Sequence, residues 1–255
     1  MHVVLVDVGN SATKIALATE DSLLWHKVLK TQPVDTLIQT LQAQTSGLNP
    51  DLCLLCSVVP SLNAKLIEIL KTCLHSPVKL VPQEIPIPLA TLYTNPAQLG
   101  SDRLAAAYAA KCLYSTAATQ IIVDVGTALT IDCVSQECFQ GGFILAGPKL
   151  ALNALAQHTA LLPKIKLAAA SPSFHLGRTT TECIAQGALY GTIVQIEGLC
   201  ARIKQCFQAP HVIVGTGGFI GNLQHLTSIF TAIYPELVLE GLRCLACHLT
   251  KVEQH

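Results

Sequence analysis

One stretch of this sequence occurs twice in similar form. Residues 4–17 read VLVDVGNSATKIAL, and residues 121–134 read IIVDVGTALTIDCV. Each copy has an apolar, mostly β-branched run, then Asp-Val-Gly, then a turn rich in small or hydroxyl residues, then a second strand-like run. This order predicts a β-hairpin with a glycine at its bend. Two copies separated by nearly half the chain predict two duplicated domains.

Similar elements are expected after each hairpin. Strands are predicted where apolar runs are short, and helices where apolar residues recur at helical spacing. The arrangement predicts an α/β fold of two mixed α/β domains that face each other across a cleft, residues 1–117 and 118–255. The predicted strands are 23–30, 51–58, 78–81, 139–145 and 211–214. The predicted helices begin near 34, 62, 101, 149, 181, 222 and 237.

The composition favours a small-molecule partner. Hydrophobic residues make up 51% of the chain and charged residues 13%, and 16 Lys and Arg balance 16 Asp and Glu. With no net charge and no basic run, neither a nucleic acid nor an anionic membrane is an expected partner. The uncharged residues 205–235 are interrupted by Pro210, the glycine-rich turn at 215–218 and polar side chains, so we expect no membrane span there.

Eleven cysteines in a chain whose start does not resemble a secretory signal predict a reducing, cytoplasmic location. Two pairs, Cys53/Cys56 and Cys244/Cys247, have the spacing of zinc ligands. Both lie in apolar runs without the turn residues of a zinc knuckle. We interpret them as small core side chains, although together they could supply four thiolates.

The first hairpin has the residues of an anion-binding turn. A bend with Gly9 and Asn10 can direct several backbone N–H groups toward one point. Ser11 and Thr13 add hydroxyl groups, and Lys14 adds positive charge. Asp7 at the strand end could hold Mg²⁺ directly or through water. The alternative is an ordinary turn, but a second copy at 124–132 favours two loops that grip a polyphosphate.

Two further segments carry candidate chemistry. Residues 215–219 (GTGGF) follow a predicted strand and precede a helix, where glycines allow a ring or phosphate to approach the backbone. Residues 100–103 (GSDR) place Ser101 as a predicted helix N-cap, with Asp102 available to accept a hydroxyl proton and Arg103 to pair with a carboxylate. The alternative for this segment is a capped helix with a surface ion pair. Neither a Walker-type phosphate loop nor a dinucleotide-binding glycine pattern occurs.

Together these motifs resemble the sugar kinase, heat-shock chaperone and actin superfamily, and in particular the type III pantothenate kinases. Besides the two hairpins and the late glycine turn, the resemblance includes the segments YTNP at 93–96, GSDR at 100–103, GGFILAG at 141–147, LLP at 161–163, GRTT at 177–180 and IAQG at 184–187. The resemblance implies two RNase H-like (actin-like ATPase) domains, each a mixed five-stranded sheet with flanking helices. It also implies phosphorylation of pantothenate by ATP, the first step of coenzyme A biosynthesis.

The resemblance also implies site residues. Asp102 would be the catalytic proton acceptor, and Asp124 the ligand of a monovalent cation, potassium or ammonium. Homodimers are expected, with the substrate pocket completed at the subunit interface. ATP, with Mg²⁺, would be bound by Asp7, Val8, Gly9, Asn10, Ser11, Ala12, Thr13, Lys14 and Thr127; pantothenate would be bound by Tyr93, Gly100, Ser101, Asp102, Arg103 and Thr180.

Four positions depart from the family pattern. Ser11 and Leu129 stand where Thr is usual, Ala146 where Pro is usual and Thr179 where Asn is usual. Leu129 is expected to remove one phosphate donor. Because Asp102, Arg103 and Asp124 are present, we expect an active enzyme. The rival hypotheses are a polyphosphate or phosphate-ester hydrolase on the same fold and a transcriptional accessory protein. The neutral charge and the intact Asp102/Arg103 pair argue against the accessory protein.

Overall fold

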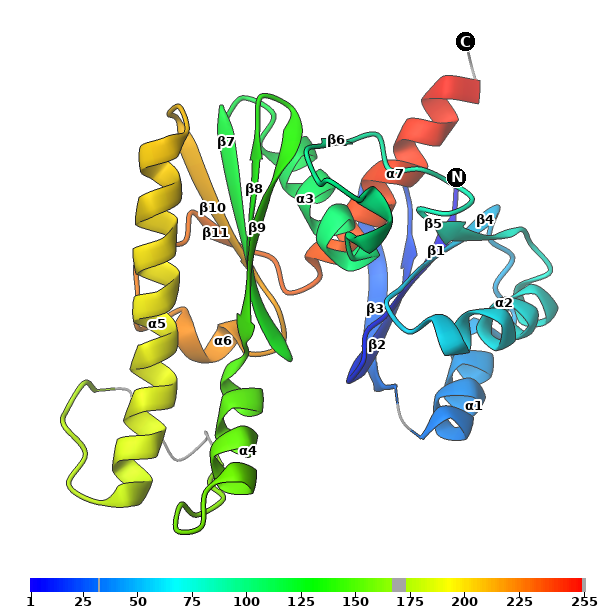
Figure 1. Cartoon of the computed structure of the whole chain (residues 1–255). Helices are drawn as coiled ribbons and strands as arrows, with labels where there is room; N and C mark the ends of the chain where they lie inside the picture. The colour runs from blue at the N-terminus through cyan, green and yellow to red at the C-terminus, as the bar shows by residue number, and fades with distance from the viewer. Residues whose placement is uncertain (32, 167–172, 254–255) are drawn as a thin grey trace. The chain divides into compact units, whose positions relative to one another are not determined.

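Figure 1 shows a computed structural model of the chain, which describes residues 1–31, 33–166 and 173–253. The chain divides into two compact units. Unit 1 comprises Met1–Leu113 together with the C-terminal stretch from Glu236, and unit 2 comprises Tyr114–Pro235. The expected boundary after residue 117 is four residues from the observed one. The C-terminal helix, expected in the second domain, belongs to unit 1 because its apolar side chains pack on the first sheet and on α3 (Ser101–Leu113).

Unit 1 contains a mixed five-stranded sheet, as predicted. Its strand order is β3-β2-β1-β4-β5. The hairpin of β1 and β2 is antiparallel, β3 continues it, and β4 and β5 add on the other side of β1 in parallel. The strands are β1 (Val3–Val8), β2 (Ala12–Ala18), β3 (Leu23–Lys30), β4 (Leu52–Ser57) and β5 (Val78–Val81).

Helices cover both faces of this sheet. Alternate residues of β1, such as Val4 and Val6, share a core with leucines of α1 (Val34–Thr45) and α2 (Pro60–Leu74). The intervening residues, Leu5 and Asp7, point to the opposite face because side chains alternate along a strand. On that face α7 (Leu237–Glu253) contacts β1, β2 and β4, and α3 contacts β4 and α7. A short strand β6 (Ala90–Thr91) and a 3₁₀ turn (Pro96–Gln98) precede α3.

Unit 2 repeats the hairpin arrangement. Five strands of this unit follow the order β11-β10-β7-β8-β9. As in the first unit, the hairpin strands β7 and β8 are antiparallel, and a later strand, β10, pairs with the first hairpin strand in parallel. The predicted duplication is therefore confirmed. The strands are β7 (Thr119–Val125), β8 (Ala128–Ser135), β9 (Cys138–Ala146), β10 (His211–Thr216) and β11 (Ala232–Ile233).

The long helix α5 (Thr180–Cys206) lies along the sheet of unit 2, with α4 (Pro148–His158) beside it (Figure 1). Their apolar residues, including Leu152 and Ile196, complete the core over β7 and β8. The helix predicted to begin near 222 and to continue to about 230 was wrong in extent, since α6 begins at Ile220 and ends at Leu223. After Leu223 the chain must return to the sheet, where Thr231 N donates to Ile213 O (2.8 Å) at the start of β11. No helix in the described part of the chain is both long and apolar enough to cross a membrane.

Candidate active site

The first predicted phosphate loop is a tight hairpin end. Gly9 N donates a hydrogen bond to Ala12 O (2.9 Å), and a Cβ on Gly9 would lie 3.0 Å from that same oxygen. Asn10 and Ser11 are exposed at the tip. Behind the loop, the Thr31 hydroxyl donates to Gly9 O (2.7 Å) and lies 3.0 Å from the Thr13 hydroxyl. Thr31 therefore supports the loop, a role for which the sequence carried no local signal.

Thr13 and Lys14 occupy opposite faces of β2. Thr13 is fully buried and its hydroxyl faces Thr31, so the expected hydroxyl donor lies behind the loop rather than on its ligand-facing side. Lys14, the next residue, alternates to the other face. Its Nζ lies 3.1 Å from Glu236 Oε2, and His26 Nε2 lies 3.6 Å from the other oxygen of that carboxylate. Sequence reasoning missed Glu236 because it stands 222 positions after Lys14.

The GSDR segment is attached to the end of β4, the strand that pairs with β1. Ser101 is the first residue of α3, and its hydroxyl donates to Ser57 O (3.0 Å) at the end of β4. The expected N-cap role of Ser101 is therefore wrong, since its side chain instead anchors α3 to the sheet. In register, Cys56 of β4 pairs with Asp7 of β1, and Ser57 pairs with Val8.

Cys56 shows that the two candidate carboxylates share this region. Burial raises the pKa of the Cys56 thiol, and the negative charges of Asp7 and then Asp102 raise it further, against a hydrogen bond from Ser101 that lowers it. In the register of the sheet Asp7 lies beside Cys56, and Asp102 follows Ser101, whose hydroxyl is bonded to Ser57 O. The Mg²⁺ candidate and the catalytic candidate therefore come from neighbouring segments of unit 1, the end of β1 and the start of α3.

Asp102 is held in a largely desolvated position. Its Oδ1 accepts a hydrogen bond from Arg103 N (2.7 Å) in the first turn of α3. A Cβ on Gly100 would lie 2.6 Å from the same oxygen, so glycine leaves room for the carboxylate. Desolvation raises the pKa of Asp102, against the lowering by the Arg103 N–H and by the Arg103 charge. A carboxylate whose pKa is raised is a better proton acceptor than an ordinary aspartate.

Arg103 and Tyr93, which were both assigned to substrate binding, contact each other. Arg103 Nη1 donates to the Tyr93 hydroxyl (3.2 Å), and the guanidinium carbon lies 5.8 Å from the centre of the tyrosine ring. Arg103 is buried, which excludes the alternative of a surface ion pair. A guanidinium is well suited to pair with a carboxylate ligand.

Unit 2 builds a second glycine-lined loop around Asp124. In register, Asp124 of β7 pairs with Thr216 of β10, directly before the glycine turn. A Cβ on Gly126 would lie 3.1 Å from Asp124 Oδ1, and a Cβ on Gly217, whose φ is +97°, would overlap the same oxygen and the backbone of Val125. Phe219 N donates to Val125 O (2.9 Å). The second DVG segment and the late glycine turn thus form one structure.

The remaining candidates of unit 2 are distributed around this loop. Thr127 is exposed, and its carbonyl accepts a hydrogen bond from Gly147 N (3.1 Å), so the segment with Ala146 keeps its contact with the loop. Leu129 is fully buried in the core of unit 2, so its side chain belongs to packing and not to the ligand-facing surface. Thr180 is exposed at the start of α5, and Thr179 caps that helix by accepting a hydrogen bond from Glu182 N (3.2 Å).

The cysteine pairs are not arranged as a zinc site. Cys53 and Cys56 are buried in β4, as expected for core side chains, whereas Cys244 and Cys247 lie partly exposed on α7. Across the described residues, no group of three or more His, Cys, Asp or Glu side chains is placed to hold a metal ion. All eleven cysteines are free thiols.

Comparisons with known proteins agree with this arrangement. The family model for type III pantothenate kinase matches residues 3–202. The type III pantothenate kinase of Desulfovibrio desulfuricans is 36% identical over 96% of this chain and 96% of its own length. Among solved structures, a putative Baf family transcriptional activator from Campylobacter jejuni superposes with a TM-score of 0.64 at 20% identity, covering 97% of this chain and 99% of its own. A ROK hexokinase from Thermus thermophilus superposes with a TM-score of 0.51 at 16% identity, covering 98% and 100%. The two solved structures confirm the actin-like, sugar-kinase fold, and the sequence matches show that this chain belongs to the type III pantothenate kinase family.

Proposed function

We propose that this chain transfers the terminal phosphoryl group of ATP to the primary hydroxyl of pantothenate, giving 4'-phosphopantothenate, the first step of coenzyme A biosynthesis. The observation that carries the proposal is the position of Asp102, desolvated at the start of α3, which Ser101 anchors to β4 beside the end of β1 that carries Asp7. Family membership and the names of the relatives support the choice of pantothenate. Asp102 would accept the hydroxyl proton as the oxygen attacks phosphorus.

The residues present fit a nucleotide bound with Mg²⁺. At Gly9, Gly126 and Gly217 a side chain would crowd or overlap the backbone or Asp124, so each loop depends on glycine for its tight backbone. Asp7 provides carboxylate oxygens of the kind that Mg²⁺ prefers. The ion, when bound, neutralises charge on the phosphates. We assign the ATP contacts to the loop at Asp7–Lys14 and to Thr127, with Thr13 acting through loop support.

The residues of the chain then have separate tasks. Asp102 holds the proton, and Arg103, oriented by Tyr93, binds the substrate carboxylate. Ser101 fixes the first turn of α3 to β4, which keeps Asp102 in place. Gly100 leaves room for the Asp102 carboxylate, and Thr180 adds a substrate hydroxyl contact. Phosphoryl transfer depends mostly on positioning and charge stabilisation, so this set of groups suffices.

Asp124 is assigned as the ligand of potassium or ammonium. Gly126 and Gly217 pack against its carboxylate, and a monovalent ion accepts carboxylate oxygens in a looser arrangement than Mg²⁺ does. With saturating MgATP in a Tris buffer free of both ions, turnover should be very low and should recover on adding potassium. Asp124→Ala should lose this response. Full activity without either ion would leave Asp124 as a magnesium or structural carboxylate.

The active form is proposed to be a cytoplasmic homodimer. Large apolar side chains of unit 2 are exposed in the single chain, and a partner subunit could cover them: Phe143 and Ile144 on β9, Leu150 and Leu155 on α4 and Val194 on α5. The free cysteines support a reducing compartment. Light scattering should give twice the 27.1 kDa of one chain; an active particle with the mass of one chain would contradict the dimer.

The decisive experiment measures ADP release with and without pantothenate. A kinase should release ADP only when pantothenate is present, and mass spectrometry should find phosphopantothenate in equal amount. A hydrolase would release ADP and phosphate in either condition. An accessory protein without enzymatic activity would produce neither ADP nor phosphopantothenate. Equal ADP release with and without pantothenate would reject the proposed function.

A further inference from the structure

A cluster of thiols connects α3 with α7, outside the proposed active site. Tyr108 and Cys112 lie one turn apart on α3, and Cys244 and Cys247 lie one turn apart on α7. The two helices approach closely, because a Cβ on Gly241 of α7 would overlap the carbonyl of Ala105 on α3. This close approach suits the short separation that a covalent link between two helices requires.

The thiol of Cys112 lies near two side chains of the cluster. The Cys244 thiol and the Tyr108 hydroxyl are both close enough to act on its pKa. Cys244 contributes most to lowering the pKa of Cys112, followed by Tyr108 and by the charges of Lys111 and Arg243. Burial raises the pKa of Cys112, and the net result is a pKa of about 7. By contrast, burial raises the pKa of Cys133 and of Cys200 to about 12. Cys112 is also exposed, so solutes can reach it.

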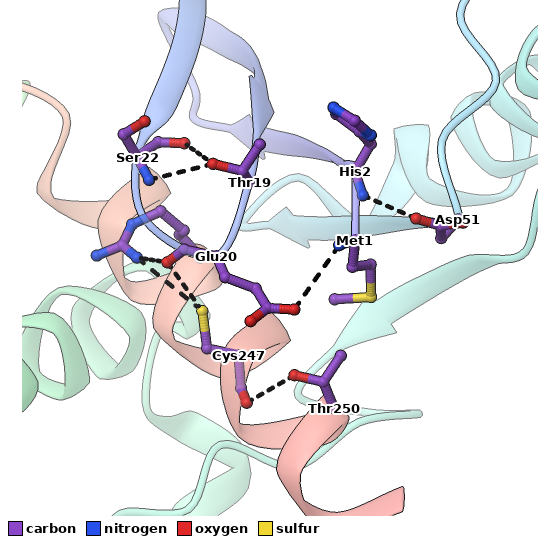
Figure 2. A network of polar contacts seen from close by, with 9 residues as sticks. Met1, His2, Thr19, Glu20, Ser22, Asp51, Cys247 and Thr250 are labelled. Atoms are coloured by element: carbon purple, nitrogen blue, oxygen red, sulfur yellow. Dashed lines mark hydrogen bonds and ion pairs between the residues drawn. The ribbon is translucent and has the colours of Figure 1, made fainter. Parts of the chain in front are cut away.

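Cys247 is held in a different way. Its thiol donates to Glu20 O (3.2 Å), at the turn between β2 and β3, as Figure 2 shows. The Glu20 side chain in turn lies 3.7 Å from the N-terminal amine of Met1. Arg243 lies beside both cysteines of α7. Its Nη2 is 4.0 Å from Cys244 Sγ, and its Nη1 is 4.0 Å from Cys247 Sγ. The Arg243 Nε donates a hydrogen bond to Glu240 (2.7 Å). Of the two cysteines on α7, Cys244 is therefore the one that acts on the pKa of Cys112.

We propose that Cys112 is a peroxide-reactive thiol and that Cys244 is its resolving partner, so that oxidation links α3 to α7 by a disulfide. The Cys112 thiolate attacks one oxygen of hydrogen peroxide; the O–O bond breaks, hydroxide leaves, and Cys112 becomes a sulfenic acid. The Cys244 thiol then attacks that sulfur. The S–O bond breaks, the S–S bond forms, and the thiol proton leaves with the hydroxyl as water. A thiol reductant reverses the link.

The bond would join two helices that carry proposed site residues near their N-terminal ends. Asp102 and Arg103 stand in the first turn of α3, and Glu236, the partner of Lys14, immediately precedes α7. The proposal itself concerns only the thiols, so it can be tested whether or not the chain phosphorylates pantothenate.

The reactivity of Cys112 is tested on the reduced full-length protein. At neutral pH about half of a thiol with a pKa of about 7 is ionised, against about 3% of an ordinary thiol. The lower nucleophilicity of the more acidic thiol offsets part of this gain, leaving about a threefold advantage. Timed alkylation with iodoacetamide, read by peptide mass spectrometry, should modify Cys112 about three times faster than Cys206, which is also exposed. Equal rates, or faster reaction at Cys206, would overturn the proposal.

The disulfide is tested with hydrogen peroxide on the same protein. Peptide mapping should find Cys112 linked to Cys244, with the loss of two hydrogen atoms in mass, and dithiothreitol should remove the link. Cys244→Ser should abolish it and leave a Cys112 sulfenic acid that dimedone traps. Cys73→Ser, a change on α2 outside the cluster, should leave the link intact. A link from Cys112 to Cys247, or dimedone trapping that Cys244→Ser does not increase, would contradict the assignment of Cys244.

Discussion

The amine of Lys14 lies 3.1 Å from the carboxylate of Glu236, so the first phosphate loop is joined to the segment that returns from unit 2 to unit 1. Both side chains are only about one-sixth exposed, at 16% and 14%. His26 approaches the second oxygen of the same carboxylate at 3.6 Å. The Lys14 side chain therefore has a defined position next to the loop, set by a residue from the far end of the chain.

Glu236→Gln should destabilise the protein. The change removes the negative charge opposite Lys14 while keeping the shape, and a partly buried cation without its partner costs about 1–2 kcal/mol. Urea denaturation should show this loss. Lys79→Gln is the matched control, because its ion pair with Glu84 is about 45% exposed on both sides and should change stability by less than about 0.5 kcal/mol. Wild-type stability in Glu236→Gln would mean that the pair is energetically neutral.

Asp102→Asn should abolish most turnover without unfolding the chain. Asparagine keeps the size of the side chain but cannot accept the hydroxyl proton, and loss of a general base lowers kcat by about 10²–10⁴-fold. Calorimetric titration should show ATP binding close to wild type. Asp35→Asn, on the exposed surface of α1, serves as the control and should keep full activity. Near-normal kcat in Asp102→Asn would exclude Asp102 as the base.

The pH dependence of kcat/KM should report the raised pKa of Asp102. Desolvation raises this pKa above the ordinary aspartate value of 3.8, and only the ionised form can accept a proton. Activity should therefore be complete above the raised pKa and should fall as the pH drops through it. Initial rates measured against pH, with low pantothenate and saturating ATP, follow this fall in activity. A fall centred at or below pH 3.8 would contradict the desolvated position.

Arg103→Ala should raise KM for pantothenate more than KM for ATP. A charge-assisted hydrogen bond to a carboxylate contributes about 1.5–3 kcal/mol, which corresponds to roughly 10–100-fold in affinity. Tyr93→Phe keeps the ring below the guanidinium but removes the acceptor for Arg103 Nη1, so its effect on the same constant should be less than about tenfold. Arg202→Ala, on the exposed side of α5, is the control. Equal losses for both substrates in Arg103→Ala would indicate a general structural role.

Gly217→Ala and Gly218→Ala should behave differently although they are neighbours. Gly217 has φ +97°, and an added Cβ would overlap Asp124 and the Val125 backbone, whereas a Cβ on Gly218 would meet no atom within 4 Å. The first change should cost at least about 2 kcal/mol and weaken ATP binding. The second should stay within about 0.5 kcal/mol of wild type. Thermal unfolding and ATP titration of both variants make the comparison. Similar behaviour would mean that the turn adapts to a side chain.

The sequence by itself determined the hairpins, most of the strands and most of the helices, but not the two-residue strands β6 and β11. Alternation of apolar side chains, Asp-Val-Gly at each bend and helical spacing are local signals, and β3 and β5 have the predicted ends. The family resemblance then assigned roles to residues such as Asp102 and Arg103. Their local setting was not predictable, since Ser101 bonds to Ser57 and Arg103 is buried against Tyr93.

Only the tertiary structure decided which distant residues meet. The support of Gly9 by Thr31, the pairing of Lys14 with Glu236 and the contact of Cys112 with Cys244 join positions 22, 222 and 132 residues apart. The same holds for α7, which follows the strands of unit 2 in the chain but packs in unit 1. Such contacts leave no periodic pattern in the sequence, because any partner of suitable size and charge could have supplied them. Packing α3 and α7 against one face of the sheet brings Lys14 to Glu236 and Cys112 to Cys244, whereas Thr31 reaches Gly9 from the end of β3.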